Sequence, residues 1–195
     1  MRNHPCRAER MAMPALQHPE FWTAEMVLAL PDDGMRHETV HGELFVTPSP
    51  RLWHQIVLDN LADQLKLYLR REPVGRVIDK AADISWAPDV LVQPDLFVAP
   101  LSELRTLNWA QVKSLILVVE VLSRSTTRAD RFAKRRVYQE VGIPLYWIVD
   151  ADRHQVEVWT PEALEPVIER ERLQWRPEGA GAPCVVELGG VFRAV

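Results

Sequence analysis

Apolar residues recur along the chain with two different spacings, which predict an alternation of helices and strands. From Trp53 to Arg71 they recur every three or four positions, as on one face of a helix. From Leu115 to Leu122 they form a nearly unbroken run, as in a strand buried on both faces. The predicted elements are a helix over 23–30, a hairpin over 37–46, a helix over 53–71, strands over 77–86, 90–98 and 115–122, a connector over 100–111, a helix over 129–141, strands over 145–149 and 155–159, and edge strands over 167–175 and 185–188.

This order of elements predicts an α/β domain. A helix, three strands, a helix and a strand form an αβββαβ core around a mixed sheet, preceded by an N-terminal helix and a β-hairpin. A chain of 195 residues has the length of one ordinary domain rather than two. We therefore expect a single domain over residues 19–195 and a disordered tail over residues 1–18, which lack the apolar segment of a secretory signal.

Composition indicates a globular protein of the cytoplasm. The hydrophobic fraction of 47% and the charged fraction of 26% are typical of such proteins. Glu120 interrupts the longest apolar run, so no segment is long enough to cross a membrane. Cys6 and Cys184 lie near opposite ends without metal-type spacing, which argues against a disulfide framework or a zinc knuckle and fits a reducing compartment.

The charge distribution points to a localised site for a polyanion. A net charge of −4 argues against a protein that coats nucleic acid indiscriminately. Residues 124–136 nevertheless contain six arginines and lysines against one aspartate. Arg124, Arg128 and Arg131 are the candidates for phosphate contacts. The alternative is that this basic run is an ordinary solvated helix face.

Two acidic residues fall inside apolar segments where an unpaired charge is costly. Glu120 lies in the run over 115–122, and Asp95 follows Pro94 in the preceding predicted strand. If these strands are neighbours, about 4.8 Å apart, both carboxylates can converge on one cation. Carboxylates with waters suit Mg²⁺ or Mn²⁺, and the Val121 carbonyl could add an oxygen. The alternatives are an Asx turn at Asp95 and a buried ion pair of Glu120 with Lys134 or Arg128.

A lysine follows this strand on the next predicted helix. Lys134 lies one turn after Asp130 and one turn before Tyr138, so the three share a stripe. A lysine near a metal can stabilise hydroxide or neutralise charge on a phosphate. The alternatives are an ordinary i,i+4 pair of Asp130 with Lys134, and a packing role for Tyr138 with its hydroxyl at the rim.

These residues resemble the PD-(D/E)XK nuclease superfamily, with one departure: Leu122 stands where the lysine is usual. The segment from Val119 to Thr126, followed by Lys134, resembles the Uma-two family of putative restriction endonucleases, in which the lysine is thought to come from the next helix. Arg124 stands where that family usually has proline. The resemblance runs from Phe21 to Trp159, and further pieces of it are Arg36-His37-Glu38, Gly42-Glu43-Leu44, Pro48-Ser49-Pro50, His54-Gln55 and Tyr146-Trp147-Ile148-Val149-Asp150.

The resemblance implies a restriction-endonuclease-like fold and a metal-dependent endonuclease that hydrolyses DNA. It implies that Asp95 and Glu120 hold Mg²⁺ (or Mn²⁺) and that Lys134 assists the attack of water. His54 and Glu43 are secondary candidates that orient the water or a second ion, with Glu43 preferred to Glu38. A homodimer is expected because cutting two strands needs two sites.

Two other functions and two other kinds of site remain open from the sequence. A domain of this fold can be a catalytically silent binder of nucleic acid or a scaffold, and a nuclease of this kind can act on RNA. His37, His41 and His54 are a candidate zinc set, although their spacing matches no zinc motif. Ser123 is a weak candidate nucleophile because it has no evident base.

Overall fold

The structure is a computed structural model that describes residues 19–80, 82–123 and 126–194. Its helices are α1 (Ala24–Leu28), α2 (Leu52–Leu69), α3 (Leu101–Leu104), α4 (Arg135–Glu140) and α5 (Leu188–Val191), with a 3₁₀ turn at Trp109–Gln111 and a π-helical segment at Ala129–Lys134. Its strands are β1 (Arg36–Val40), β2 (Glu43–Thr47), β3 (Gly75–Ile78), β4 (Ile84–Ala87), β5 (Val90–Val92), β6 (Leu96–Pro100), β7 (Leu117–Val121), β8 (Tyr146–Asp150), β9 (Gln155–Trp159), β10 (Val167–Glu169), β11 (Arg172–Trp175) and β12 (Cys184–Glu187).

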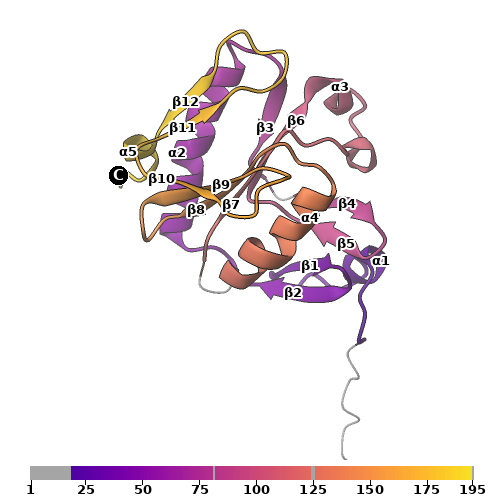
Figure 1. Ribbon diagram of the computed structural model, residues 1–195. Coiled ribbons are helices and arrows are strands. Elements are labelled where there is room, and N and C mark those ends of the chain that lie inside the picture. Colours follow the sequence, from indigo (N-terminus) through magenta and orange to yellow (C-terminus); the bar gives the residue numbers. More distant parts are fainter. Residues whose placement is uncertain (1–18, 81, 124–125, 195) are drawn as a thin grey trace, which may run out of the picture.

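A six-stranded mixed sheet forms the centre of the molecule, in the order β10-β9-β8-β7-β6-β3 (Figure 1). β7 and β8 run parallel, and the other neighbouring strands run antiparallel. The chain passes from β7 to β8 through the π-helical segment and α4, as parallel neighbours require a crossover. The predicted αβββαβ core with a mixed sheet is therefore present, formed by α2, β3, β6, β7, α4 and β8.

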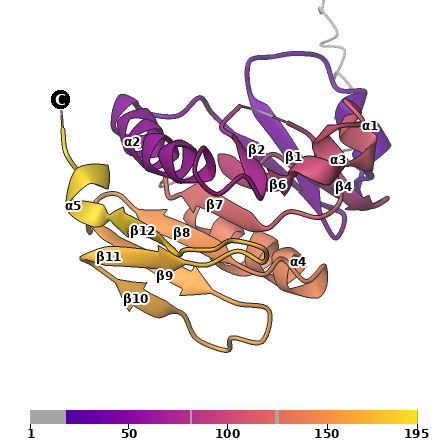
Figure 2. The same ribbon diagram turned by 90° about the horizontal axis from the view of Figure 1, so that it is seen from above.

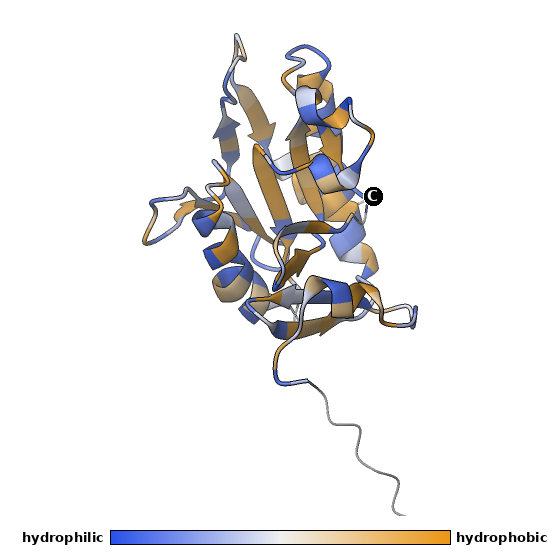
Figure 3. Cartoon of the chain, turned by 90° about the vertical axis from the view of Figure 1, so that its right-hand side faces the viewer, coloured by the Kyte–Doolittle hydropathy of each residue, from blue (hydrophilic) through white to orange (hydrophobic). Residues whose placement is uncertain are grey.

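Helices cover the two faces of this sheet. Apolar residues of α2 pack with Leu117, Val119 and Val121 of β7, whereas α4 packs with Val118 and its neighbours on the opposite face. α2 and α4 accordingly lie on opposite sides of β7 and β8 (Figure 2). The central strands are largely hydrophobic, and the helices alternate between hydrophobic and hydrophilic residues (Figure 3). The alternation along each strand thus sends every second side chain toward a different layer.

A second sheet holds the predicted hairpin. Its order is β2-β1-β5-β4, and the hairpin turn falls at His41 and Gly42, as the sequence predicts. Both residues have positive φ angles, 50° and 80°, which suits a tight turn between twisted strands. The ring of Phe21 fills the space where a side chain at Gly42 would stand. The sheet lies beside α4 (Figure 1).

Two predicted strands are wrong because each divides between the two sheets. The segment 77–86 yields β3 in the large sheet and β4 in the small one, and 90–98 yields β5 and β6 in the same way. The second break falls at Gln93-Pro94-Asp95, where Pro94 has no N–H to donate to a ladder. Asp95 therefore stands at the point where the chain passes from one sheet to the other.

The C-terminal part completes the layer around α2. The predicted strand over 167–175 is two strands, and β11 and β12 form a ribbon whose apolar residues join those of α2 and α5. In the described part of the chain, no helix has the length and apolar character needed to cross a membrane. Residues 1–18, for which we predict a disordered tail, lie outside the described residues.

Candidate active site

Asp95 and Glu120 lie side by side on the face of the large sheet that α4 covers. In the antiparallel pair of β6 and β7, Leu96 is opposite Val119, which brings Asp95 opposite Glu120. The backbone N–H of Asp95 donates a hydrogen bond of 3.3 Å to Glu120 Oε2. The alternation of side chains along two neighbouring strands thus brings the two predicted metal ligands together.

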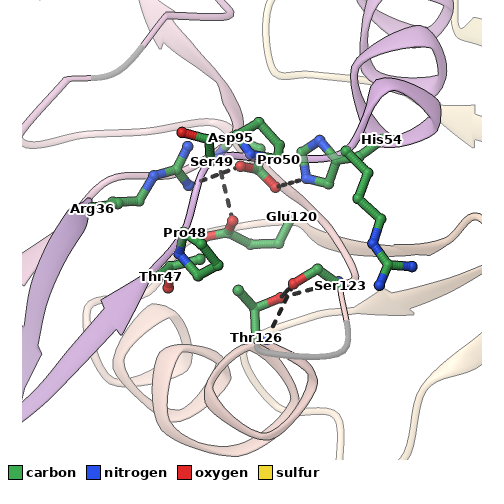
Figure 4. Close-up of a pocket in the computed structure, with 11 residues that line it drawn as sticks. Arg36, Thr47, Pro48, Ser49, Pro50, His54, Asp95, Glu120, Ser123 and Thr126 are labelled. Atoms are coloured by element: carbon green, nitrogen blue, oxygen red, sulfur yellow. Dashed lines mark hydrogen bonds and ion pairs between the residues drawn. The ribbon is translucent and has the colours of Figure 1, made fainter. Parts of the chain in front are cut away.

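Three donors hold the Asp95 carboxylate. Arg36 Nη1 donates to Oδ1 at 2.8 Å, while the Val121 amide donates to Oδ2 at 2.9 Å. His54 Nε2 lies 3.1 Å from the same Oδ2, so Asp95 sits between Arg36 and His54 (Figure 4). Burial alone would raise the pKa of Asp95, but the hydrogen bond and charge of His54 and the charge of Arg36 lower it below its usual range. Asp95 is therefore ionised at neutral pH.

Glu120 is held by the helix that follows β7. Its Oε1 lies 3.0 Å from Lys134 Nζ and accepts a hydrogen bond of 3.1 Å from the Tyr138 hydroxyl. Burial raises the pKa of Glu120 well above its usual value, and the nearby acids add to this effect while Lys134 opposes it. The hydroxyl of Tyr138 is buried against Glu120, so the expectation that it lies at the rim is wrong.

Lys134 is the central cation of a buried acidic cluster. Its Nζ lies 2.8 Å from Glu38 Oε1, 3.0 Å from Glu120 Oε1 and 3.5 Å from Asp130 Oδ1, and its side chain is 1% exposed. Burial would lower the pKa of Lys134, but Glu120, Glu38 and Asp130 raise it well above its usual value. The i,i+4 pair with Asp130 is the longest of the three contacts, so this is not an ordinary surface pair.

A π-helical turn carries Lys134 into the cluster. Ala129–Lys134 is π-helical and continues directly into α4. π-helical turns are rare and are often found at functional sites. Asp130, Lys134 and Tyr138 are all at most 1% exposed, so the predicted stripe faces inward as a unit.

The hairpin supplies Glu38 to the site rather than Glu43, which corrects the order of preference drawn from the sequence. Glu38 is 1% exposed, and its Oε1 accepts a hydrogen bond of 2.7 Å from the Gln93 amide besides contacting Lys134. Glu43 is exposed and lines a separate groove beside Arg128 and Phe132. The two acids share one face of the hairpin, but Glu43 adjoins the turn, whereas Glu38 lies at the middle of β1.

The cluster has more negative than positive groups. Four acids, Glu38, Asp95, Glu120 and Asp130, are in contact with two cations, Arg36 and Lys134. A bound divalent cation would stabilise the ionised forms of these acids. Within residues 19–80, 82–123 and 126–194, no group of three or more His, Cys, Asp or Glu side chains is arranged to hold a metal by itself. Two carboxylates and waters are nevertheless the ligand set that suits Mg²⁺.

The three histidines do not form the candidate zinc set. His37 Nε2 lies 3.6 Å from Asp33, His41 Nε2 lies 3.0 Å from Glu140, and His54 contacts Asp95. Each imidazole is thus paired with a different acid, and the described part of the chain has no group of three or more His, Cys, Asp or Glu side chains that could hold a metal. The zinc alternative therefore has no support in the geometry.

A pocket of about 260 Å³ opens over the acids. Its lining comprises Arg36, Thr47, Pro48, Ser49, Pro50, Arg51, His54, Asp95, Glu120, Ser123 and Thr126 (Figure 4). The pocket adjoins the N-terminus of α2, whose first residue has no side-chain capping hydrogen bond from Arg51. Free amides at a helix N-terminus favour anions such as phosphate. The pocket thus combines a carboxylate floor with a rim suited to an anion.

The three arginines predicted to contact phosphate differ in whether their side chains are already engaged within the fold. Arg131 donates a hydrogen bond of 2.7 Å from Nε to Glu157 and lies 3.4 Å from Asp150, so its guanidinium is already engaged within the fold. Arg128 is exposed and lines the groove next to the hairpin, and Arg124 lies outside the described residues. The sequence interpretation missed Arg36 and Arg51. Alternation along β1 is the signal for Arg36, since it lies two positions before Glu38 on the same face.

Asp130 predicts a measurable pH dependence of stability. Burial and the acids Asp95 and Glu38 raise the pKa of Asp130 to about 6, against the opposing effects of Lys134 and Thr126. Between about pH 4 and pH 6 the folded protein then binds more protons at this site than the unfolded chain, so stability falls as the pH rises. A difference of about two pKa units corresponds to at most about 3 kcal/mol.

We expect Asp130→Asn to remove the decrease in stability that Asp130 causes as the pH rises. The free energy of unfolding of the variant relative to wild type should increase from pH 4 to pH 7 and level off above it, by up to about 3 kcal/mol. Urea titrations of both proteins with EDTA present, at several pH values in this window, measure the difference. A constant difference at all pH values would contradict the raised pKa.

Comparisons with known proteins agree with this architecture. The chain matches the family model Uma2, described as "Putative restriction endonuclease", over residues 24–182. It is also similar to the crystal structure of a putative nuclease belonging to DUF820 from Anabaena variabilis ATCC 29413. That match has a TM-score of 0.72 and 18% sequence identity, and it covers 88% of this chain and 97% of that chain. The search of the curated proteins found no match.

The two matches together confirm the fold and the family. At 18% identity the likeness to the solved structure concerns the fold alone, and it confirms the predicted restriction-endonuclease-like core. The family match spans most of the chain, including both sheets and every acid of the cluster. The chain therefore belongs to the Uma2 family of putative restriction endonucleases.

Proposed function

We propose that this protein is a metal-dependent endonuclease that hydrolyses phosphodiester bonds of DNA. The observation that carries the proposal is the adjacent pair of Asp95 and Glu120 at the floor of an open pocket, in a cluster with two more acids than cations. Membership of a family described as putative restriction endonucleases supports the same reaction class. The substrate is assigned from the family and from the two arginines, Arg36 and Arg51, that line the pocket.

The two carboxylates are the proposed metal ligands. Asp95 and Glu120 would hold Mg²⁺ or Mn²⁺, with the Val121 carbonyl as a further predicted oxygen ligand. A bound divalent cation lowers the pKa of water, which provides a nucleophile at neutral pH, and offsets the negative charge of the phosphate. The Val121 amide and His54 fix the Oδ2 side of Asp95 for this purpose.

Lys134 acts in this scheme as a fixed positive charge. Because its pKa is raised well above the usual value, it stays protonated and does not accept a proton from water. Its contacts hold Glu120 and Glu38 in place, and its charge compensates the acids that face the pocket. It is therefore a positioning residue for Glu120.

Positive groups around the pocket are the proposed contacts of the DNA backbone. Arg36 and Arg51, the residue that precedes α2, line the pocket directly. Arg128 lies further along the surface, at the groove between the hairpin and α4. Contacts of this kind hold phosphates without reading the sequence.

A cleavage assay tests the proposal. Purified protein should nick or cut plasmid DNA with Mg²⁺ or Mn²⁺, and EDTA should stop the reaction. Asp95→Asn should remove the activity because it removes a ligand charge. Asp59→Asn, an exposed position on α2, should leave it unchanged. Intact plasmid and single-stranded DNA with both metals would count against a nuclease.

Two other outcomes separate the remaining candidates. A catalytically silent binder would retain DNA affinity without cutting, and an RNA nuclease would cut RNA in preference to DNA in a parallel assay. Light scattering of the purified protein tests the expected homodimer, which coordinated cutting of two strands would require.

A further inference from the structure

Arg36 lies beside Asp95 at the wall of the open pocket. Its Nη1 donates to Asp95 Oδ1 at 2.8 Å and to the Gln93 carbonyl at 3.1 Å. The Arg36 side chain is 24% exposed, whereas that of Asp95 is 6% exposed. Figure 4 shows its guanidinium reaching Asp95 from the side opposite His54. Any cation that approaches Oδ1 from the pocket therefore meets Arg36.

Among the partners of Asp95, Arg36 is the one that can leave. The Val121 amide belongs to a buried strand, and the His54 side chain is 10% exposed on α2. Arg36 is joined to its strand by a long flexible side chain and is the most exposed of the three. An ionised carboxylate has about four acceptor sites, two on each oxygen. Oδ1 thus has room for a metal when the guanidinium moves aside.

Lys134, unlike Arg36, cannot move away from the acids that it contacts. Lys134 is enclosed among three acids and is 1% exposed, so its charge is permanent. Arg36 contributes a charge at the pocket wall, where Thr47, Ser49 and Arg51 also lie. A guanidinium is well suited to bind a phosphate with two parallel hydrogen bonds. The same pocket that would receive a phosphodiester is the space into which Arg36 can turn.

We infer that Arg36 is an exchangeable cation, which neutralises Asp95 before a divalent metal binds and then transfers its hydrogen bonds to a phosphate of the substrate. This inference rests on the proposed function and deepens it, because it couples metal binding to substrate binding at one side chain. Reciprocity then requires that substrate strengthen metal binding by the factor by which metal strengthens substrate binding. In this inference, the movement of Arg36 produces this coupling between metal binding and substrate binding.

The test compares Mn²⁺ affinity and DNA affinity without cleavage. Titration calorimetry with Mn²⁺ alone should show that Arg36→Gln binds the metal more tightly, by roughly 5-fold or more, the lower end of ordinary coupling. In the same variant, Mn²⁺ should lose most of its effect on binding of a phosphorothioate-substituted, cleavage-resistant duplex, followed by fluorescence anisotropy. Arg36→Lys, which keeps a cation with fewer donors, should lie between wild type and Arg36→Gln in both measurements.

Arg51→Gln is the matched control, because Arg51 lines the same pocket and carries the same charge. In the described part of the chain, the side-chain partners of the Asp95 carboxylate are Arg36 and His54, not Arg51. It should raise Mn²⁺ affinity clearly less than Arg36→Gln and lower DNA affinity whether or not Mn²⁺ is present. Circular dichroism verifies that each variant is folded, and Arg36→Lys alone decides the matter if Arg36→Gln does not fold.

The outcomes separate this inference from the proposed function. If Arg36 only holds Asp95 in position, Arg36→Gln will bind Mn²⁺ more weakly than wild type, which overturns the inference. An equal rise in Arg36→Gln and Arg51→Gln also overturns it, since the effect is then general electrostatics. If wild type binds neither Mn²⁺ nor Mg²⁺, the proposed function itself fails.

Discussion

Glu120→Gln should abolish cleavage and leave the protein at least as stable as wild type. The amide keeps the size of the side chain and an oxygen for Lys134 and Tyr138, but it lacks the charge that a metal ligand needs. Burial raises the pKa of Glu120, so its ionisation at neutral pH opposes folding. Activity should fall by more than about 100-fold, the upper end for residues that only support a ligand. Plasmid cleavage and urea denaturation measure the two effects.

The combination of outcomes identifies the role of Glu120. Replacement of an acid that stabilises the fold would lower the stability of the protein. Replacement of a functional acid, whose ionised form is destabilised by burial, should not lower it. DNA affinity of Glu120→Gln, measured by anisotropy with EDTA present, should stay close to that of wild type. Retained cleavage would exclude Glu120 as a ligand. Lost affinity with lost stability would show that the change unfolds the site.

Lys134→Met is expected to cost about 3–5 kcal/mol of unfolding free energy, the range for breaking a buried charged network from one side. The change leaves Glu38, Glu120 and Asp130 without their shared cation in a buried environment. These acids can take up protons at low pH, so the loss should be larger at pH 8 than at pH 5. Urea denaturation at both pH values, with EDTA present, measures it.

Lys66→Met is the matched control for this change. Lys66 pairs with one acid, Asp79, and its side chain is 37% exposed, so its loss should cost about 0–1 kcal/mol. Adding Glu38→Gln to Lys134→Met should restore part of the lost stability, because it removes one of the uncompensated acids. If Lys134→Met is no more destabilising than Lys66→Met, the buried cluster does not carry the electrostatic role assigned to it.

The position of the two acids was predictable because it follows from strand periodicity. Glu120 lies in an apolar run typical of a strand that is covered on both faces, and β7 confirms this. The break at Pro94, which separates β5 from β6, was not predicted, but Asp95 still adjoins the start of β6. The neighbouring pairing of those strands brings Asp95 and Glu120 together. The inward stripe of Asp130, Lys134 and Tyr138 follows from helical spacing in the same way, although it begins in a π-helical turn.

The supporting residues could not be predicted because local patterns do not encode long-range contacts. Glu38 and Glu43 share a face of the hairpin, so alternation does not distinguish them. The distinction arises because β1 is an inner strand next to β5, which places Glu38 beside the Gln93 amide. The engagement of Arg131 with Asp150 and Glu157 likewise depends on two strands that follow it in the chain.

The segment Gln93-Pro94-Asp95, where the chain passes between the two sheets, connects the hairpin to the candidate active site. Arg36 and Glu38 are held at this joint by the Gln93 carbonyl, the Gln93 amide and Asp95. If the hairpin swings away from the large sheet, it pulls both side chains out of the cluster in one movement. Detachment of the hairpin would inactivate the site while the main core around α2 stayed folded. Loss of activity can therefore precede loss of the fold.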